Sequence, residues 1–362
     1  SASAAALNNI ATETYIIPEH IYKDVTDFSV SELPETPVGT GPYKLKEYKR
    51  GEYFTFEANE NYYGGEAAIK NVTLRIIEST DTAKVALQKG EVDAAVVLPS
   101  DIEDLDESMI SVYPYTENRV GYLGLNTHSD ALKDVKVRQA VLYALNKNEM
   151  NQAAYLSDEY FDTPYSFLPP NNPYATEDVE KYETNVEKAK ELLQEAGVSN
   201  LQLNLAFTST DPAQTIQATL IQQQLQQAGI NVSLEGGDGT AIFTELKKAG
   251  STKYNLFLGG YIMGNDPDLY GMLFKTDGSS NYFQTQNNTT DDLFAKAAVE
   301  LDETKRKELY DQLQQAIADD ARIYPIVDNK KILAVNNRIA NVEEAGLIPI
   351  YTFEDMSKLT IK

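Results

Sequence analysis

The sequence predicts an α/β protein, because strand and helix patterns alternate along its most regular stretch. Residues 201–207 alternate apolar and polar side chains, as a strand with one buried face does. A helical pattern follows up to Gly229, then the alternating run 230–234, a second helical pattern over 241–250 and the apolar run 254–258. A β-α-β-α-β order predicts parallel strands joined by right-handed crossovers.

The first helix of this stretch has recognisable start and stop signals. Asp211 is suited to the N-cap, Pro212 to the first helical position, and Gln214 is placed to complete a capping box. Gly229 can take the left-handed conformation that ends a helix. A ligand belongs at the carboxyl ends of parallel strands, and residues 259–268 follow the apolar run 254–258 directly.

Helical patterns also occur outside this stretch. A helix is expected over 81–90 with a strand after it, and a further helix over 134–150. A Thr184/Glu187 capping box predicts a helix that ends at Gly197, and residues 304–321 predict another. Residues 161–178 are irregular and are expected to form a long surface loop, a kind of segment that is often functional.

The composition excludes several classes of function. Lys+Arg is 31 against Asp+Glu 55, a formal net charge of −24, so a nucleic-acid partner is not expected. There are no cysteines and two histidines, which leaves no disulfide, no thiolate nucleophile and no multi-histidine metal site. We therefore predict neither a metal nor a cofactor.

Membrane insertion of this chain is not expected, because no apolar run approaches the length of a membrane helix. Residues 1–20 lack a basic flank and a long apolar core, so they do not read as a signal peptide. An export signal or a lipid-anchor cysteine would have to lie upstream.

Local motifs give no support for catalysis. "VGTGPYKL" at 38–45 lacks the lysine of a P-loop and the third glycine of a dinucleotide fingerprint. "DPDLYGMLFKTD" at 266–277 has a tyrosine at the fifth position of a calcium loop and no bidentate Glu, so a helix start capped by Asp266 or Asp268 is favoured. Those two aspartates are too close in sequence to flank a sugar easily, and no G-x-S-x-G elbow occurs. The prediction is a protein that is not an enzyme.

Several segments together resemble the family 5 extracellular solute-binding proteins of ABC importers. They include "TPVGTGPYKLKEYKRGEYFTFEANENYYGG", "RVGYLGLNTHSDALKDVKVRQAVLYALNK", "NVEKAKELLQEAG" and "LDETKRKELYDQLQQAIADDARIYPIVDNKKILAVNNRI". They occur in the family's order over essentially the whole chain. The resemblance implies a periplasmic-binding-protein-like fold of the class II, or cluster C, type, in which a two-strand hinge joins two lobes.

The resemblance also implies a domain division. Residues 1–123, with 341–362 returning to them, correspond to what remains of lobe one, and residues 124–340 form lobe two. Residues 119–127 are similar to the first hinge crossing, and residues 334–342 lie close to the return. Relative to the family, an N-terminal portion is absent.

The function that the resemblance implies is that of a bacterial receptor that captures oligopeptides between its lobes. It would deliver them to the permease subunits of an ABC importer and act as a monomer. The expected location is extracellular, on a lipoprotein of a Gram-positive cell surface, or periplasmic. Open alternatives are a nickel chelate or an oligosaccharide as ligand, a sensor of peptide signals, and a hydrolase.

The expected ligand-binding residues lie in two segments that match cleft-lining segments of the family. In peptide-binding relatives an aspartate there pairs with the peptide's α-amino group, and Gly264 occupies that place here. Tyr261 aligns near a position where relatives place an aromatic residue against the ligand. The full expected set is Tyr261, Met263, Gly264, Asn265, Asp266, Asp268, Asn281 and Tyr282.

Overall fold

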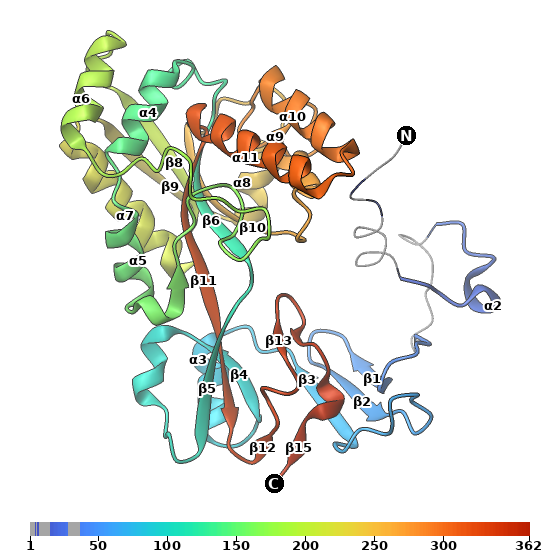
Figure 1. The fold of residues 1–362 in the computed structure, drawn as a ribbon. Coiled ribbons are helices and arrows are strands. Elements are labelled where there is room, and N and C mark those ends of the chain that lie inside the picture. The colour runs from blue at the N-terminus through green and yellow to red at the C-terminus, as the bar shows by residue number, and fades with distance from the viewer. Residues whose placement is uncertain (1–3, 5, 7–14, 28–36) are drawn as a thin grey trace. The chain divides into compact units, whose positions relative to one another are not determined.

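A computed structural model describes residues 4, 6, 15–27 and 37–362 (Figure 1). Most of residues 1–14, on which the expectation about a signal peptide rests, lie outside the described residues. The chain divides into two compact units. Unit 1 is Ser1–Thr12 with Thr116–Lys330, and unit 2 is Glu13–Tyr115 with Lys331–Lys362.

Unit 1 is built on a sheet in which strands follow the order β11-β6-β10-β8-β9. Strands β8 and β9 are parallel, as are β8 and β10, which confirms the predicted parallel arrangement. Strand β6 runs antiparallel to both β10 and β11. The bounds are β6 Arg119–Leu125, β7 Phe161–Asp162, β8 Gln202–Thr208, β9 Asn231–Gly237, β10 Leu256–Ile262 and β11 Ile323–Asn336.

Helices cover both faces of this sheet (Figure 1). Leu256 and Leu258 of β10 join the buried cluster formed with α4, α5, α6 and α7, whereas Phe257 joins the cluster formed with α8, α9, α10 and α11. This alternation is the two-residue period of a strand buried on both faces. The helices are α4 Val135–Tyr143, α5 Lys147–Tyr155, α6 Val186–Glu195, α7 Pro212–Gln227, α8 Gly239–Leu246, α9 Gly271–Phe274, α10 Asn288–Val299 and α11 Glu303–Asp319, with 3-10 turns η2 Asp158–Tyr160 and η3 Pro267–Tyr270.

The predicted N-cap of α7 is confirmed, because the Asp211 side chain accepts hydrogen bonds from the backbone N–H groups of Ala213 and Gln214. Its predicted capping box is wrong. The Oε1 atom of Gln214 instead accepts from the backbone N–H of Thr208, at the end of β8. The helix therefore starts with a side chain that ties it back to the preceding strand.

Three other sequence predictions need correction. Helix α6 is capped by Asn185 rather than Thr184, whose hydroxyl donates to the carbonyl of Leu145. The helix expected over 134–150 is two helices, because the Asn146 side chain caps a new one. The loop over 161–178 is not simply a surface loop, since Phe167 and Leu168 are each 1% exposed.

Unit 2 contains an antiparallel sheet β1-β2-β3 and the strands that pair with the second half of β11. Strand β4 pairs with residues 332–335 of β11, and β5 pairs with β11 as well. Its elements are α2 Glu19–Tyr22, β1 Tyr43–Lys49, β2 Tyr53–Ala58, β3 Asn71–Arg75, α3 Thr80–Gln88, β4 Ala94–Val97, η1 Pro99–Asp104, β5 Ile110–Thr116, β12 Ile339–Ala340, β13 Leu347–Ile348, β14 Thr352–Phe353, η4 Met356–Lys358 and β15 Thr360–Ile361. The helix and strand predicted after residue 80 are α3 and β4.

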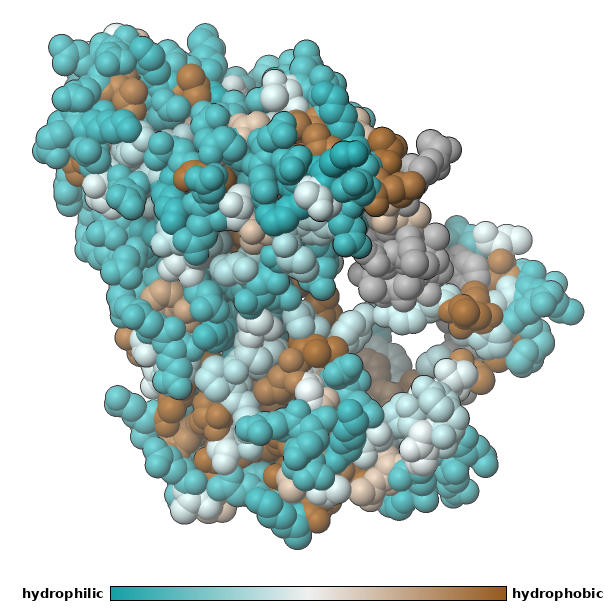
Figure 2. Space-filling view, in the orientation of Figure 1, coloured by the Kyte–Doolittle hydropathy of each residue, from teal (hydrophilic) through white to brown (hydrophobic). Residues whose placement is uncertain are grey.

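The surface agrees with the acidic composition. Figure 2 shows hydrophilic residues over most of the visible face of the unit 1 helices, with smaller hydrophobic patches between them. Within the described residues, no helix combines the length and the apolar character needed to cross a membrane.

Candidate functional site

The candidate site lies at the carboxyl end of β10, where the parallel strands of unit 1 finish. The strand does not stop at Leu258, as the sequence suggested, but continues through Gly259, Gly260 and Tyr261 to Ile262. Strand β6 supports this extension by pairing antiparallel with it, Gly260 opposite Gly121 and Ile262 opposite Arg119. The two glycines therefore belong to the sheet rather than to a turn after it.

Tyr261 is half-buried on the face of the sheet covered by α8–α11. Its hydroxyl donates a hydrogen bond of 2.5 Å to the carbonyl oxygen of Phe167. The ring centroids of Tyr122 and Tyr270 lie 5.3 and 5.6 Å away. Burial, followed by the neighbouring Tyr270, raises the pKa of Tyr261 well above its usual value. A neutral hydroxyl with a fixed partner is suited to holding the segment in place.

Asp266 caps the next turn, which confirms that reading of the "DPD" sequence. Its Oδ1 atom accepts a hydrogen bond of 3.0 Å from the backbone N–H of Asp268. The same oxygen accepts one of 2.8 Å from Nη2 of Arg306, and Asp266 is only 4% exposed. The carboxylate is therefore engaged by the protein itself.

Arg306, on α11, gathers several parts of the chain around this carboxylate. Its Nε donates to the carbonyl of Ala297 at 3.1 Å and its Nη1 to the hydroxyl of Tyr174 at 3.0 Å. Its guanidinium carbon also lies 5.4 Å from the ring centroid of Tyr174 and 5.2 Å from that of Tyr310. A planar guanidinium with several donors can satisfy such a buried polar cluster.

The other expected residues of this segment differ in their surroundings. Asp268 is half-buried, and desolvation, followed by the charge of Asp266, raises its pKa above the usual value. Met263 is half-buried against the apolar cluster of α8–α11. A Cβ atom at Gly264 would lie 2.9 Å from Cδ1 of Leu269, the end of a flexible side chain. Asn265 is exposed and lines a pocket of about 380 Å³ together with Pro173, Tyr174, Asp266, Glu303 and Lys307.

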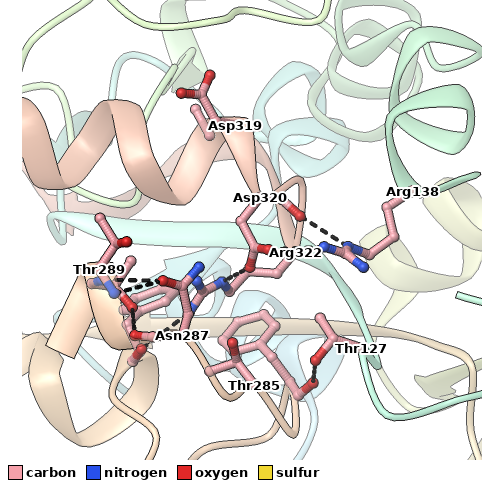
Figure 3. Close-up of polar contacts among 12 residues, drawn as sticks. Thr127, Arg138, Thr285, Asn287, Thr289, Asp319, Asp320 and Arg322 are labelled. Carbon is pink, nitrogen blue, oxygen red and sulfur yellow. Dashed lines mark hydrogen bonds and ion pairs between the residues drawn. The ribbon is translucent and has the colours of Figure 1, made fainter. Parts of the chain in front are cut away.

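The second predicted segment forms a closed turn. The amide of Asn281 donates to the carbonyl of Thr285 at 2.9 Å and accepts from the backbone N–H of the same residue at 3.1 Å. Figure 3 shows Thr127 beside this turn, and its hydroxyl donates to the carbonyls of Phe283 and Gln284. The ring of Tyr282 packs against Phe243 with centroids 4.9 Å apart. Asn281 therefore shapes the turn.

A buried ionic cluster lies next to α9, the helix that follows the first predicted segment. Asp320 lies between Arg138 and Arg322 in Figure 3, with contacts of 2.8 and 2.5 Å. Arg322 also donates to the carbonyl of Phe274 at 3.1 Å. Because Arg322 is fully buried, these contacts fix the end of α9 to the start of β11.

In the part of the chain that the structure describes, no group of three His, Cys, Asp or Glu side chains could hold a metal ion. Asp266 and Asp268 are close in sequence, but Arg306 occupies the first carboxylate. Hydrogen-bonding tyrosine and asparagine side chains, backbone groups and a half-buried carboxylate are better suited to binding an organic ligand than to chemistry on it.

Comparison with known proteins identifies the family. Residues 2–283 match the model of bacterial extracellular solute-binding proteins, family 5 (middle). The chain belongs to this family. Its members are solute-binding receptors rather than enzymes, and they are extracellular or periplasmic.

Individual relatives of this solute-binding protein agree with that assignment. It is 28% identical over 333 residues to the oligopeptide-binding protein AppA of Bacillus subtilis, a match that covers 86% of this chain and 61% of AppA. The chain therefore spans about three fifths of the length of that curated relative.

Solved structures confirm the periplasmic-binding-protein-like fold. The substrate-binding protein CtaP of Listeria monocytogenes, an ABC transporter component, matches with a TM-score of 0.92 and 37% identity, over 95% of this chain and 71% of CtaP. A putative peptide-binding protein AppA from Clostridium difficile matches with a TM-score of 0.93 and 32% identity, over 100% of this chain and 75% of that protein.

Sequence reasoning missed the residues that position the predicted segments in this solute-binding protein. Arg306 holds Asp266, Phe167 accepts from Tyr261, and the amide of Asn172 donates to the carbonyl of Asn265 at 3.0 Å. Phe167 and Asn172 lie in the irregular stretch 161–178, whose unusual length was the one signal available. No local pattern marks Arg306, because its partner is 40 residues away along the chain.

Proposed function

We propose that this chain is the ligand-binding part of an extracellular receptor that captures oligopeptides and delivers them to an ABC importer. The observation that carries the proposal is the family match over residues 2–283, together with 28% identity to an oligopeptide-binding protein. The partners would be a peptide and the importer's permease subunits, and the receptor would act as a monomer. A cell-surface lipoprotein of a Gram-positive bacterium is the proposed setting, with a periplasmic one as the alternative.

We propose further that the ligand lies at the carboxyl end of β10. Tyr261, Met263, Gly264, Asn265, Asp266, Asp268, Asn281 and Tyr282 remain the proposed set. The contacts divide their roles: Tyr261, Asp266 and Asn281 already bind other parts of the protein, so they would shape the site. Met263, Asn265, Asp268 and Tyr282 are half-buried or exposed and would reach the ligand.

The lobes proposed for this receptor are residues 1–123 with 341–362, and residues 124–340. The compact units offer a related division at 115/116 and 330/331. In receptors of this architecture a hinge motion encloses the ligand. Backbone hydrogen bonds to an extended peptide would then give affinity without strict sequence preference.

Native mass spectrometry of the 362-residue chain tests the proposal. The probe is a degenerate pool of tri- to nonapeptides, with a mixture of oligosaccharides and nickel–histidine as competitors. Retention of peptides over a narrow range of lengths is expected. Selective retention of a competitor would overturn the peptide assignment, and turnover of a peptide that Asp268→Asn abolishes would overturn the receptor assignment.

A further inference from the structure

Arg119, the first residue of β6, lies at the carboxyl end of β10 but is not among the residues predicted from the sequence. It faces Ile262, the last residue of β10, in the antiparallel pairing. Its backbone N–H donates to Oδ1 of Asp328 at 3.2 Å, which fixes its main chain against β11. The side chain is half-buried.

Two glycines make room for this guanidinium on the sheet. A Cβ atom at Gly260 would lie 2.1 Å from Nη2 and 2.3 Å from Cζ of Arg119, and one at Gly121 would lie 3.0 Å from Nη1. Because real Cβ atoms do not come that close, the guanidinium lies directly over the glycine backbone. This arrangement gives Gly260 of the "LGGY" sequence a specific structural purpose.

The charge of Arg119 acts on Asp328, where it opposes the rise in pKa that burial causes, but the two side chains do not form an ion pair. Arg138, Arg306, Arg322 and Arg338 each contact a carboxylate within 2.8 Å. Among the described residues, no carboxylate lies within ion-pair distance of the Arg119 guanidinium, whose Nη1 donates a hydrogen bond of 3.0 Å to Oδ1 of Asn329.

Two acidic groups of this region already have partners. Asp328 accepts hydrogen bonds from Thr116 and from the backbone of Arg119, and Asp162 lies 3.7 Å from the ammonium of Lys330. In a chain of net charge −24, a half-buried arginine without a carboxylate is therefore an exception. A guanidinium with free donors favours a planar anion that accepts two parallel hydrogen bonds.

We propose that Arg119 binds a carboxylate of the peptide ligand, which makes it a determinant of specificity in this receptor. The inference rests on the proposed peptide-binding function and adds the group that the ligand must carry. The carboxylate can be the peptide's C-terminus or an acidic side chain, which present the same chemistry to the guanidinium. Its position at the ends of the parallel strands is where a ligand of an α/β sheet is expected.

Binding of paired peptides by the 362-residue chain tests this inference. Each probe in a pool of tri- to nonapeptides is supplied as the free acid and as the C-terminal amide, and acidic members are supplied with Asp or with Asn. The wild type is expected to prefer the carboxylate form. Arg119→Gln is expected to lose this preference and to bind the free form roughly ten- to a hundredfold more weakly.

Two further variants separate a binding role from a structural one. Arg50→Gln changes the net charge equally at an exposed site and is expected to keep the wild-type preference. Gly260→Ala keeps the arginine but displaces its guanidinium, so it is expected to weaken the preference as Arg119→Gln does. The midpoint of thermal unfolding, measured for each variant, shows whether a loss of binding reflects a loss of fold.

The outcomes distinguish this inference from the proposed function. Peptide binding with the same carboxylate preference in wild type and Arg119→Gln would overturn the role of Arg119 and leave the receptor function intact. Equal binding by the wild type of both members of every pair, the C-terminal acid and amide as well as the Asp and Asn forms, would do the same. Failure of the wild type to bind any peptide would overturn both. Sensitivity to the Asp/Asn exchange alone would identify the side chain as the source of the carboxylate and support the inference.

Discussion

The Oδ1 atom of Asp266 accepts a hydrogen bond of 2.8 Å from Nη2 of Arg306, and the two side chains are only 2% and 5% exposed. The pair joins the end of the candidate ligand segment to helix α11. Asp266→Asn would leave Arg306 charged and buried without its counter-ion. We expect it to lower the free energy of unfolding by roughly 3–5 kcal/mol, measured by urea denaturation.

Asp311→Asn is the matched control, because it breaks an ion pair on the same helix. Lys307 and Asp311 are also 2.8 Å apart, but they are 45% and 40% exposed. The expected loss is below about 1 kcal/mol. Similar losses in the two variants would show that burial does not govern the Asp266–Arg306 pair.

Gly124 is expected to tolerate no side chain, because β6 crosses a large ring there. A Cβ atom at this position would lie 2.2 Å from Cζ of Phe257, which is fully buried. Gly124→Ala should lower the free energy of unfolding by roughly 1–3 kcal/mol. Gly39→Ala, where a Cβ meets nothing within 4 Å, should change it by less than about 0.5 kcal/mol.

Asp328 should make stability depend on pH. Burial raises its pKa to about 6, against about 3.9 in an unfolded chain, while the hydrogen bonds from Thr116 and Arg119 act in the opposite direction. The folded state therefore holds the proton more tightly, and this contribution to stability is complete below about pH 4 and is lost as the pH rises through 6.

The measurement is the free energy of unfolding of wild type and Asp328→Asn between pH 3.5 and 7. As the pH rises across this range, the free energy of unfolding of the wild type should fall by roughly 2–3 kcal/mol relative to that of the variant. A difference that stays constant with pH would show that Asp328 titrates normally.

Gly264→Asp should strengthen the binding of peptides with a free α-amino group, because it would supply a carboxylate at the position where the family resemblance places the aspartate of peptide-binding relatives. The flexible end of Leu269 is the group that has to move. Affinities for free and N-acetylated peptides provide the measurement. Equal affinities in the variant would exclude an α-amine site at residue 264.

Tyr282→Ala should weaken peptide binding more than it lowers the melting temperature. The side chain is half-buried and packs edge-on against Phe243, so its removal leaves no enclosed cavity. Titration with the peptide that the wild type retains best is compared with thermal unfolding. A large drop in melting temperature with unchanged affinity would make Tyr282 a core residue.

Local chemistry predicted the elements of this protein well where one residue decides the outcome. Asp211 and Pro212 begin α7 as expected, because an N-cap and a proline act on adjacent backbone groups. The alternation around Leu203 and Leu205 predicted β8 for a similar reason. In both cases the structure depends only on residues that are neighbours in the sequence, so the sequence pattern is sufficient to predict it.

Predictions were wrong where a distant residue decides the outcome. The Gln214 side chain accepts a hydrogen bond from the end of β8 instead of completing the capping box of its own helix. The Gly259–Gly260 pair stays in a strand because β6 continues beside it. The partner of Asp266 comes from another helix. These contacts depend on tertiary pairing, which a single sequence without an alignment does not reveal.

Strand β11 has a consequence for how the protein is made. Its first residues pair with β6, where Ile323 lies opposite Gly124, about 200 residues earlier in the chain, and its last residues pair with β4. The eight-stranded sheet cannot be completed until the ribosome has synthesised β11, although β1, β2 and β3 can pair with one another before that. Such long-range pairing slows folding. This sheet would therefore remain incomplete until β11 is made, and the nascent chain would depend on chaperones during that interval.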